Sequence, residues 1–197
     1  THPADSKISA SCKIEVLPLP KTVYVSMAQH LGAPAKPVVE VGAEVKTGQV
    51  IAEPGGFISA FVHSPVTGTV KAIAPRQDLA GNWMTHIEIT VAEEEVWADG
   101  IDTTKDIVTA IPADNAFIID RIKSNGVVGL GGATFPTHVK LCPPPGKKAD
   151  CLILNGAECE PYLTSDNRIM IERSREIVIG AALMKKVLGG CPAVIGI

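Results

Sequence analysis

A glycine-rich stretch at residues 126–137, followed by Lys140, carries the residue pattern with the clearest chemical potential. Four of its first seven residues are glycine, so backbone N–H groups can approach a ligand closely and converge on an anion. A short helix after the loop would add the positive end of its dipole, and Lys140 would add a full charge for a phosphate. The stretch lacks the Gly-Lys-Ser/Thr of a P-loop, and no strand precedes it as in the dinucleotide fingerprint. A phosphate cradle and a tight turn without a ligand both fit these residues.

A second polar stretch, Asn-Gly-Ala-Glu-Cys-Glu-Pro-Tyr at residues 155–162, follows a predicted strand at 149–155. Ligands of open α/β sheets bind at the carboxyl ends of the strands. Asn155 offers a donor and an acceptor, and the carboxylates of Glu158 and Glu160 accept from hydroxyl or ring N–H groups. Taken alone, the stretch also fits a solvated acidic loop. We expect both loops to meet on one side of the same sheet.

The cysteines are few, scattered and without a Cys-x-x-Cys pair, which argues against a disulfide framework, a structural zinc site and an iron–sulfur cluster. Cys159 lies between two glutamates that disfavour a thiolate, so we do not expect it to be a nucleophile. The sequence therefore predicts neither a catalytic side chain nor a metal site. The five cysteines are Cys12, Cys142, Cys151, Cys159 and Cys191.

Residues 17–91 combine β-branched triplets with closely spaced turn signals, which predicts a small all-β unit. Its two halves are similar, since Val-Lys-Thr-Gly at 45–48 recurs inexactly as Pro-Val-Thr-Gly at 65–68. Duplicated short hairpins of this kind form a flattened barrel that protects its strand edges by closure.

From Asp114 the periodicity becomes helical. Asp114 can cap a helix that ends at Asn125-Gly126. A strand at 149–155 buried on both faces, a helix at 166–188 and a strand from Pro192 predict a parallel βαβ unit. A parallel sheet needs more strands than these, so we expect the chain to be part of a longer protein.

The composition is that of a core-forming globular protein: 197 residues, 20.7 kDa, net charge −3 and mean hydropathy +0.22. The longest apolar run, residues 177–184, is far shorter than the ~20 residues that a membrane span needs. No basic excess favours nucleic-acid binding.

The β segment resembles the barrel-sandwich hybrid of biotinyl and lipoyl carrier domains. The segment that joins its halves, residues 52–61, contains no lysine, which disfavours a carrier. The chain as a whole resembles RnfC, a component of the ion-translocating Rnf electron-transport complex, and the flavoprotein subunit of respiratory complex I. The motifs that carry this resemblance are His2-Pro3-x-x-Ser6-Lys7, residues 29–35, 56–70 and 126–140, and Leu-Asn-Gly-Ala-Glu-Cys-Glu-Pro at 154–161.

The resemblance implies a mixed α+β and α/β chain with a barrel-sandwich hybrid over residues 1–100 and the first part of a Rossmann-like FMN/NADH-binding domain over 101–197. It implies that the FMN phosphate and ribityl chain contact Gly129, Gly131, Gly132 and Lys140. Asn155 and Glu158 would contact the flavin side, while Phe135 and Glu160 would face NADH. The 4Fe–4S clusters would belong to the full-length protein only, because their ligands are absent from this chain.

The implied function is electron input to a membrane-bound NADH:ferredoxin oxidoreductase that translocates ions, with electrons passing from NADH to FMN to iron–sulfur clusters. The expected location is peripheral, on the cytoplasmic face of the cell membrane. The expected partners are other Rnf subunits and, through the complex, ferredoxin, with no nucleic acid and no membrane span. We expect this chain to be inactive alone. The alternative is a docking module that binds other subunits and no nucleotide.

Overall fold

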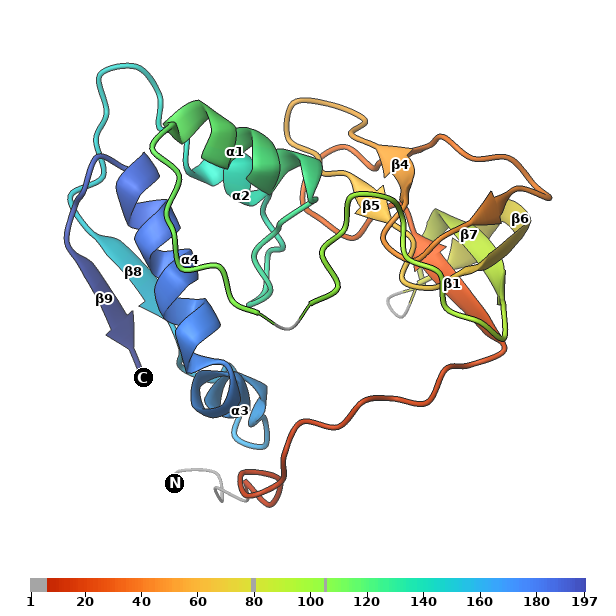
Figure 1. Ribbon diagram of the computed structural model, residues 1–197, viewed down its shortest axis with the longest axis horizontal. Helices are drawn as coiled ribbons and strands as arrows, with labels where there is room; N and C mark the ends of the chain where they lie inside the picture. Colours follow the sequence, from red (N-terminus) through yellow and green to blue (C-terminus); the bar gives the residue numbers. More distant parts are fainter. Residues whose placement is uncertain (1–6, 79–80, 105) are drawn as a thin grey trace. The chain divides into compact units, whose positions relative to one another are not determined.

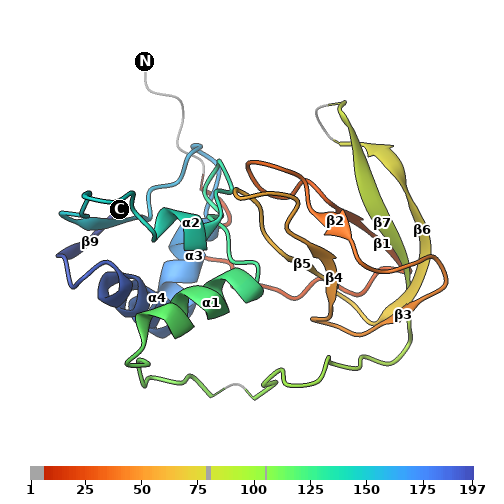
Figure 2. The same cartoon turned by 90° about the horizontal axis from the view of Figure 1, so that it is seen from above.

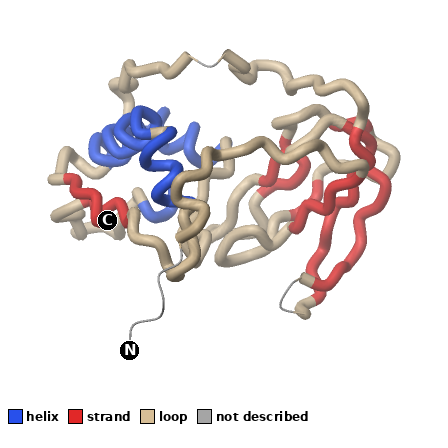
Figure 3. The backbone as a smooth tube through the Cα atoms, turned by 90° about the horizontal axis from the view of Figure 1, so that it is seen from below, coloured by secondary structure: helices blue, strands red, loops and turns tan. Residues whose placement is uncertain are grey.

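The computed structural model describes residues 7–78, 81–104 and 106–197. His2, Pro3 and Ser6 of the first motif therefore lie outside the described residues. The chain divides into two compact units. The barrel unit comprises Pro18–Lys105 and Asp120–Lys140, and the α/β unit comprises the described residues before Pro18, Asp106–Ile119 and Leu141–Ile197. Figure 3 shows the contrast in secondary structure, because the barrel unit contains long strands and the α/β unit contains helices.

The barrel unit contains two antiparallel sheets. The four-stranded sheet has the order β1 (Thr22–Ser26), β7 (Trp83–Val91), β6 (Gly68–Gln77) and β3 (Glu44–Val45). The three-stranded sheet has the order β2 (Lys36–Pro37), β4 (Val50–Glu53) and β5 (Val62–His63). The hairpin of β6 and β7 extends beyond the neighbouring strands (Figure 2). These two sheets confirm the barrel-sandwich hybrid that the spacing of turn signals predicted.

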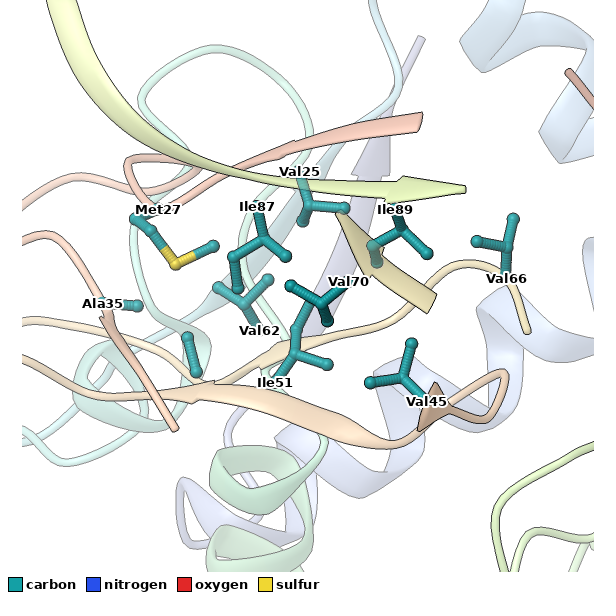
Figure 4. Packing of buried hydrophobic residues seen from close by; sticks show 11 residues of the cluster. Val25, Met27, Ala35, Val45, Ile51, Val62, Val66, Val70, Ile87 and Ile89 are labelled. Atoms are coloured by element: carbon teal, nitrogen blue, oxygen red, sulfur yellow. The ribbon is translucent and has the colours of Figure 1, made fainter. Parts of the chain in front are cut away.

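The core of the barrel unit lies between its sheets and is almost entirely aliphatic. Alternate residues of each strand point inward, so Ile87 and Ile89 of β7 face Val70 of β6 and Ile51 of β4 (Figure 4). Ile51, Ile87 and Ile89 have no solvent exposure. This close packing fixes the register of the strands, because a shift by one residue would turn these side chains outward.

The α/β unit contains a two-stranded parallel sheet of β8 (Leu152–Asn155) and β9 (Ala193–Gly196). Two helices, α3 (Ser165–Glu172) and α4 (Ser174–Val187), connect these strands (Figure 1). The predicted βαβ unit is therefore present. The prediction of one helix over 166–188 was wrong, because Arg173 leaves the helical conformation, with φ −127°.

The prediction that the strand at 149–155 is buried on both faces was also wrong. Ile153 is 67% exposed, and Val178, predicted to lie on the buried stripe of the helix, is 61% exposed. Leu152 and Leu154 are half-buried and alternate with exposed neighbours. The physical reason is that the described sheet has two strands, and α4 packs against β8 from one side only.

Two shorter helices, α1 (Asn115–Ser124) and α2 (Thr137–Lys140), flank the glycine-rich loop. The carboxylate of Asp114 accepts from the N–H of Ala116 (2.8 Å), as predicted for a cap. Gly126, with φ +64°, ends α1, and the N–H of Val127 donates to the carbonyl of Ile122 (3.1 Å) in a Schellman-type closure. In the described part of the chain, no helix has the length and apolar character to cross a bilayer.

Candidate functional site

The glycine-rich loop of the barrel unit is closed by backbone hydrogen bonds at its base. The N–H of Gly129 donates to the carbonyl of Phe135 (3.0 Å), and the N–H of Thr137 donates to the carbonyl of Val127 (3.0 Å). An isolated antiparallel bridge joins Val128 to Pro136 between them. The loop is therefore a narrow hairpin whose base has a defined conformation.

The tip of this hairpin is open to solvent. A Cβ added at Gly131 or Gly132 would meet no atom within 4 Å, and the side chain of Leu130 is 88% exposed. Gly132 has φ +122°, a conformation that side-chain-bearing residues rarely adopt. The backbone at the tip can therefore be approached closely by a ligand, which is what the sequence required of a phosphate cradle.

Lys140 lies at the end of α2, directly after the loop, and is exposed. Among the described residues, no carboxylate forms an ion pair with Lys140. Two residues earlier, the Nδ1 of His138 is buried and has no hydrogen-bond partner in the described part of the protein. Burial lowers the pKa of His138, and the charge of Lys123 lowers it further. This imidazole is therefore neutral near pH 7, and Lys140 supplies the positive charge beside the loop.

Asn155 ends β8 in the α/β unit and folds the acidic turn back on itself. Its Oδ1 accepts from the N–H of Ala157 (3.1 Å), a local side-chain bond of the Asx type. The N–H of Gly156 donates to the carbonyl of Gly196 (2.7 Å). A Cβ at Gly156 would lie 2.7 Å from the Sδ of Met170, so this turn packs tightly on α3.

Glu158 is half-buried and engages the start of α3. Its Oε1 accepts from the N–H of Asn167 (3.0 Å), which gives an N-terminal amide of the helix a carboxylate partner. Its Oε2 is buried and unpartnered among the described residues. Burial raises the pKa of Asp166, and the charge of Glu158 raises it further. One carboxylate oxygen of Glu158 is thus structural, and the other remains available to a donor.

The remaining predicted residues differ in exposure. Phe135 is half-buried at the base of the glycine hairpin, and Glu160 and Cys159 are exposed on the acidic turn. Gly129, Gly131, Gly132, Phe135 and Lys140 are brought together on one hairpin of the barrel unit. Asn155, Glu158 and Glu160 are brought together on one turn of the α/β unit.

The N-terminal segment, residues 7–14, holds the start of α3, which sequence analysis missed. The Nζ of Lys7 donates to the carbonyl of Leu163 (2.7 Å), and the Oγ of Ser9 lies 2.8 Å from the Oγ1 of Thr164. Arg168 donates to the carbonyl of Ala10 (3.2 Å). We call residues 7–14 the N-terminal strap. No sequence signal marks it, because its partners lie about 155 positions away.

Comparison with known families divides the chain at nearly the same place as the change in periodicity. Residues 1–94 match the RnfC barrel sandwich hybrid domain. Residues 122–197 match the Nuo51 FMN-binding domain, and this match includes both the glycine-rich loop and the acidic turn.

Curated relatives match both parts in one alignment, and each is the same component of a related complex. The chain is 42% identical over its full length to this component of the proton-translocating ferredoxin:NAD(+) oxidoreductase complex of Clostridium ljungdahlii. It is 42% identical over 90% of its length to that of the Na(+)-translocating ferredoxin:NAD(+) oxidoreductase complex of Acetobacterium woodii. It is 38% identical over 96% of its length to that of the ion-translocating oxidoreductase complex of Pseudomonas aeruginosa.

The chain spans 42%, 40% and 24%, respectively, of the lengths of these three relatives. The two matched modules occur in the order that the motifs predicted, and the barrel has the strand pairing expected of the first. This chain belongs to the RnfC family.

Proposed function

We propose that the chain is part of the electron-input subunit of an ion-translocating NADH:ferredoxin oxidoreductase complex and contributes part of an FMN site. The observation that carries this proposal is the open tip of the glycine hairpin beside the unpaired Lys140, within the residues that match an FMN-binding domain. The names of the relatives support the wider role, since they are subunits of ferredoxin:NAD(+) oxidoreductase complexes.

In this proposal the hairpin holds the phosphate end of FMN. Backbone N–H groups at Gly131 and Gly132 point toward the phosphate, Gly129 borders it from the base of the hairpin, and the ammonium group of Lys140 neutralises its charge. The missing side chains at the tip allow the close approach that these hydrogen bonds require. Phe135 and the exposed carboxylate of Glu160 contact NADH.

The acidic turn contributes the flavin side of the site. The free Oε2 of Glu158 accepts from a donor on the ligand, and the side-chain amide of Asn155 donates to it. Burial of an unpartnered carboxylate oxygen costs free energy, so a ligand donor at Glu158 would offset a penalty that the protein otherwise carries. When bound, FMN would accept two electrons from NADH and release them singly to iron–sulfur clusters.

The iron–sulfur clusters, the other subunits and ferredoxin belong to the proposed whole protein and its complex. Within the described ranges, no three His, Cys, Asp or Glu side chains gather to hold a metal ion. We propose that the 197-residue chain by itself is inactive, and that the whole protein acts peripherally on the cytoplasmic face of the membrane. We assign residues 1–100 to the barrel-sandwich module and 101–197 to the nucleotide-binding module.

The experiment is an FMN titration of the full-length protein, followed by quenching of flavin fluorescence, with Lys140→Ala beside the parent. Loss of a charge-assisted hydrogen bond to phosphate costs about 1.5–3 kcal/mol, so we expect roughly 10- to 100-fold weaker binding. Lys36→Ala removes an exposed lysine of β2 and serves as the matched control.

Equal affinity of Lys140→Ala and the parent would refute the phosphate role of Lys140. A parent protein that ignores FMN would refute the enzyme proposal and favour the alternative, a docking module that binds other subunits and no nucleotide.

A further inference from the structure

The glycine hairpin is attached to the barrel at both of its ends. At its start, a Cβ added to Gly126 would lie 2.3 Å from the carbonyl oxygen of Phe61, so the hairpin and the barrel are in direct contact there. At its end, the carbonyl of Thr134 accepts from the N–H of Leu31 (3.2 Å). Between these two points the tip contacts nothing at Gly131 and Gly132. The barrel thus holds the ends of the hairpin and leaves the ligand-facing tip open.

His30 makes the barrel side of this attachment rigid. Its ring is 8% exposed, and its Nε2 accepts from the N–H of Ala60 (3.0 Å) and lies 2.9 Å from the Oγ of Ser59. The same Ser59 hydroxyl donates to the carbonyl of Ala33 (2.8 Å). Residues on both sides of Leu31 are therefore tied to the segment at 59–60, and the N–H of Leu31 has a fixed position.

Gly32 makes the approach of these two segments possible. Its φ is +104°, and a Cβ there would lie 2.1 Å from the carbonyl oxygen of Ile58. That carbonyl accepts from the N–H of Ala33 (2.9 Å). The segment at 30–33 therefore has little freedom to move away from Thr134.

Thr134 needs this support. Its φ is +48°, and among the described residues it is the one non-glycine residue with positive φ. A β-branched residue in the left-handed region is unfavourable and persists where surrounding contacts impose it. Thr134 meets the barrel through the backbone bond to Leu31, so the conformation at the end of the hairpin depends on the barrel.

A pocket of about 360 Å³ separates the middle of the hairpin from the barrel. The barrel contributes Gln29, Phe61 and His63 to its wall, and the hairpin contributes Val128 and Leu130. The middle of the hairpin is therefore not packed on the barrel, and its position follows from its two attached ends.

We propose that the barrel is the mount of the nucleotide-binding hairpin, with His30 as a positioning residue that acts through Leu31 and Thr134. A loop that is ordered before the ligand arrives loses less conformational freedom on binding, and this raises affinity. The effect on FMN rests on the function proposed above, whereas the attachment itself does not. The barrel thereby gains a role in cofactor binding without contacting the cofactor.

The first test is Gly126→Ala in the full-length protein, with Gly180→Ala as the matched control. The alanine at 126 would collide with the carbonyl of Phe61, whereas a Cβ at Gly180 meets no atom within 4 Å. We expect amide hydrogen exchange of residues 127–135 to accelerate about tenfold and FMN binding to weaken about tenfold in Gly126→Ala. The control should change neither, and exchange in β6 and β7 should stay at the parent rate in both.

The second test compares His30→Leu with His30→Gln and decides the matter if Gly126→Ala fails to fold. Leucine leaves the N–H of Ala60 without its acceptor, whereas the amide oxygen of glutamine can replace Nε2. We expect fast exchange at 127–135 in His30→Leu and recovery toward the parent rate in His30→Gln.

Unchanged exchange of residues 127–135 in folded Gly126→Ala or in His30→Leu would overturn the proposed mount. If exchange accelerates as expected but the parent binds no FMN, the mount stands and the proposed function fails. The two proposals therefore fail on different measurements.

Discussion

At the scale of single residues, buried polar groups decide which side chains are free for a ligand. Glu158 uses one oxygen to hold Asn167, while its other oxygen has no partner in the described structure. Asn155 likewise commits its Oδ1 to the N–H of Ala157. The candidate residues of the acidic turn are thus half engaged in shaping the turn, and each retains one group that a ligand could use.

A pH-dependent stability is expected from His63, which borders the pocket beside the hairpin. Burial lowers the pKa of His63 from its ordinary value of 6.5, and a hydrogen bond with the Ser124 backbone partly opposes this. The unfolded chain therefore binds a proton at a higher pH than the folded chain, so stability is lost as pH falls below 6.5. His138 has the same sign of pKa shift.

We expect His63→Gln to lose less stability than the parent between about pH 8 and about pH 5.5, because glutamine does not titrate. Urea unfolding at both pH values measures this difference. An identical loss of stability in the parent and in His63→Gln would show that His63 does not contribute.

At the scale of secondary-structure elements, the N-terminal strap is the least expected feature. It supplies partners to Leu163, Thr164 and Arg168 around the start of α3. The side chain of Arg168 also donates through Nε to Glu172 (2.9 Å), whose carboxylate accepts from the N–H of Ile14 (3.0 Å). The pKa of Glu172 is lowered by these bonds, that from Arg168 first.

Arg168→Met should release the strap. The arginine side chain is 14% exposed, and losing its hydrogen bonds costs about 1–3 kcal/mol of local stability. We expect faster tryptic cleavage after Lys13. Arg175→Met, which removes an exposed arginine of α4, is the control. Equal cleavage rates in the two variants would contradict a holding role for Arg168.

At the scale of the whole molecule, the barrel resembles carrier domains in shape while it lacks their attachment chemistry. Carrier domains present a lysine on the segment joining their halves, and residues 52–61 here contain none. The corresponding structure, β4 and the turn that follows it, instead places Ser59 and Ala60 around His30. In this family member the joining segment therefore serves the hairpin mount that we propose.

The intact mass of the protein, isolated from cells that contain biotin and lipoate ligases, should equal the sequence mass, with no biotinyl or lipoyl adduct on any lysine. Intact-protein mass spectrometry measures this directly. A covalent adduct at any lysine would revive the carrier interpretation.

The sequence by itself determined the features that depend on local patterns. The turn signals and β-branched triplets of residues 17–91 were sufficient for the barrel, and Asp114 and Gly126 marked both ends of α1. The order of the two modules followed from motifs, because glycine and acidic residues at fixed spacing reflect local backbone needs.

Only the tertiary structure decided which of these residues have partners far away in the chain. It revealed the strap on α3, the contact of Gly126 with Phe61 and the bond from Leu31 to Thr134. It also corrected the burial of Ile153, because the exposure of a strand depends on what covers the sheet and not on the strand's own composition. Hydrophobic periodicity records only that a side chain suits burial, whereas the neighbours that bury it come from distant segments.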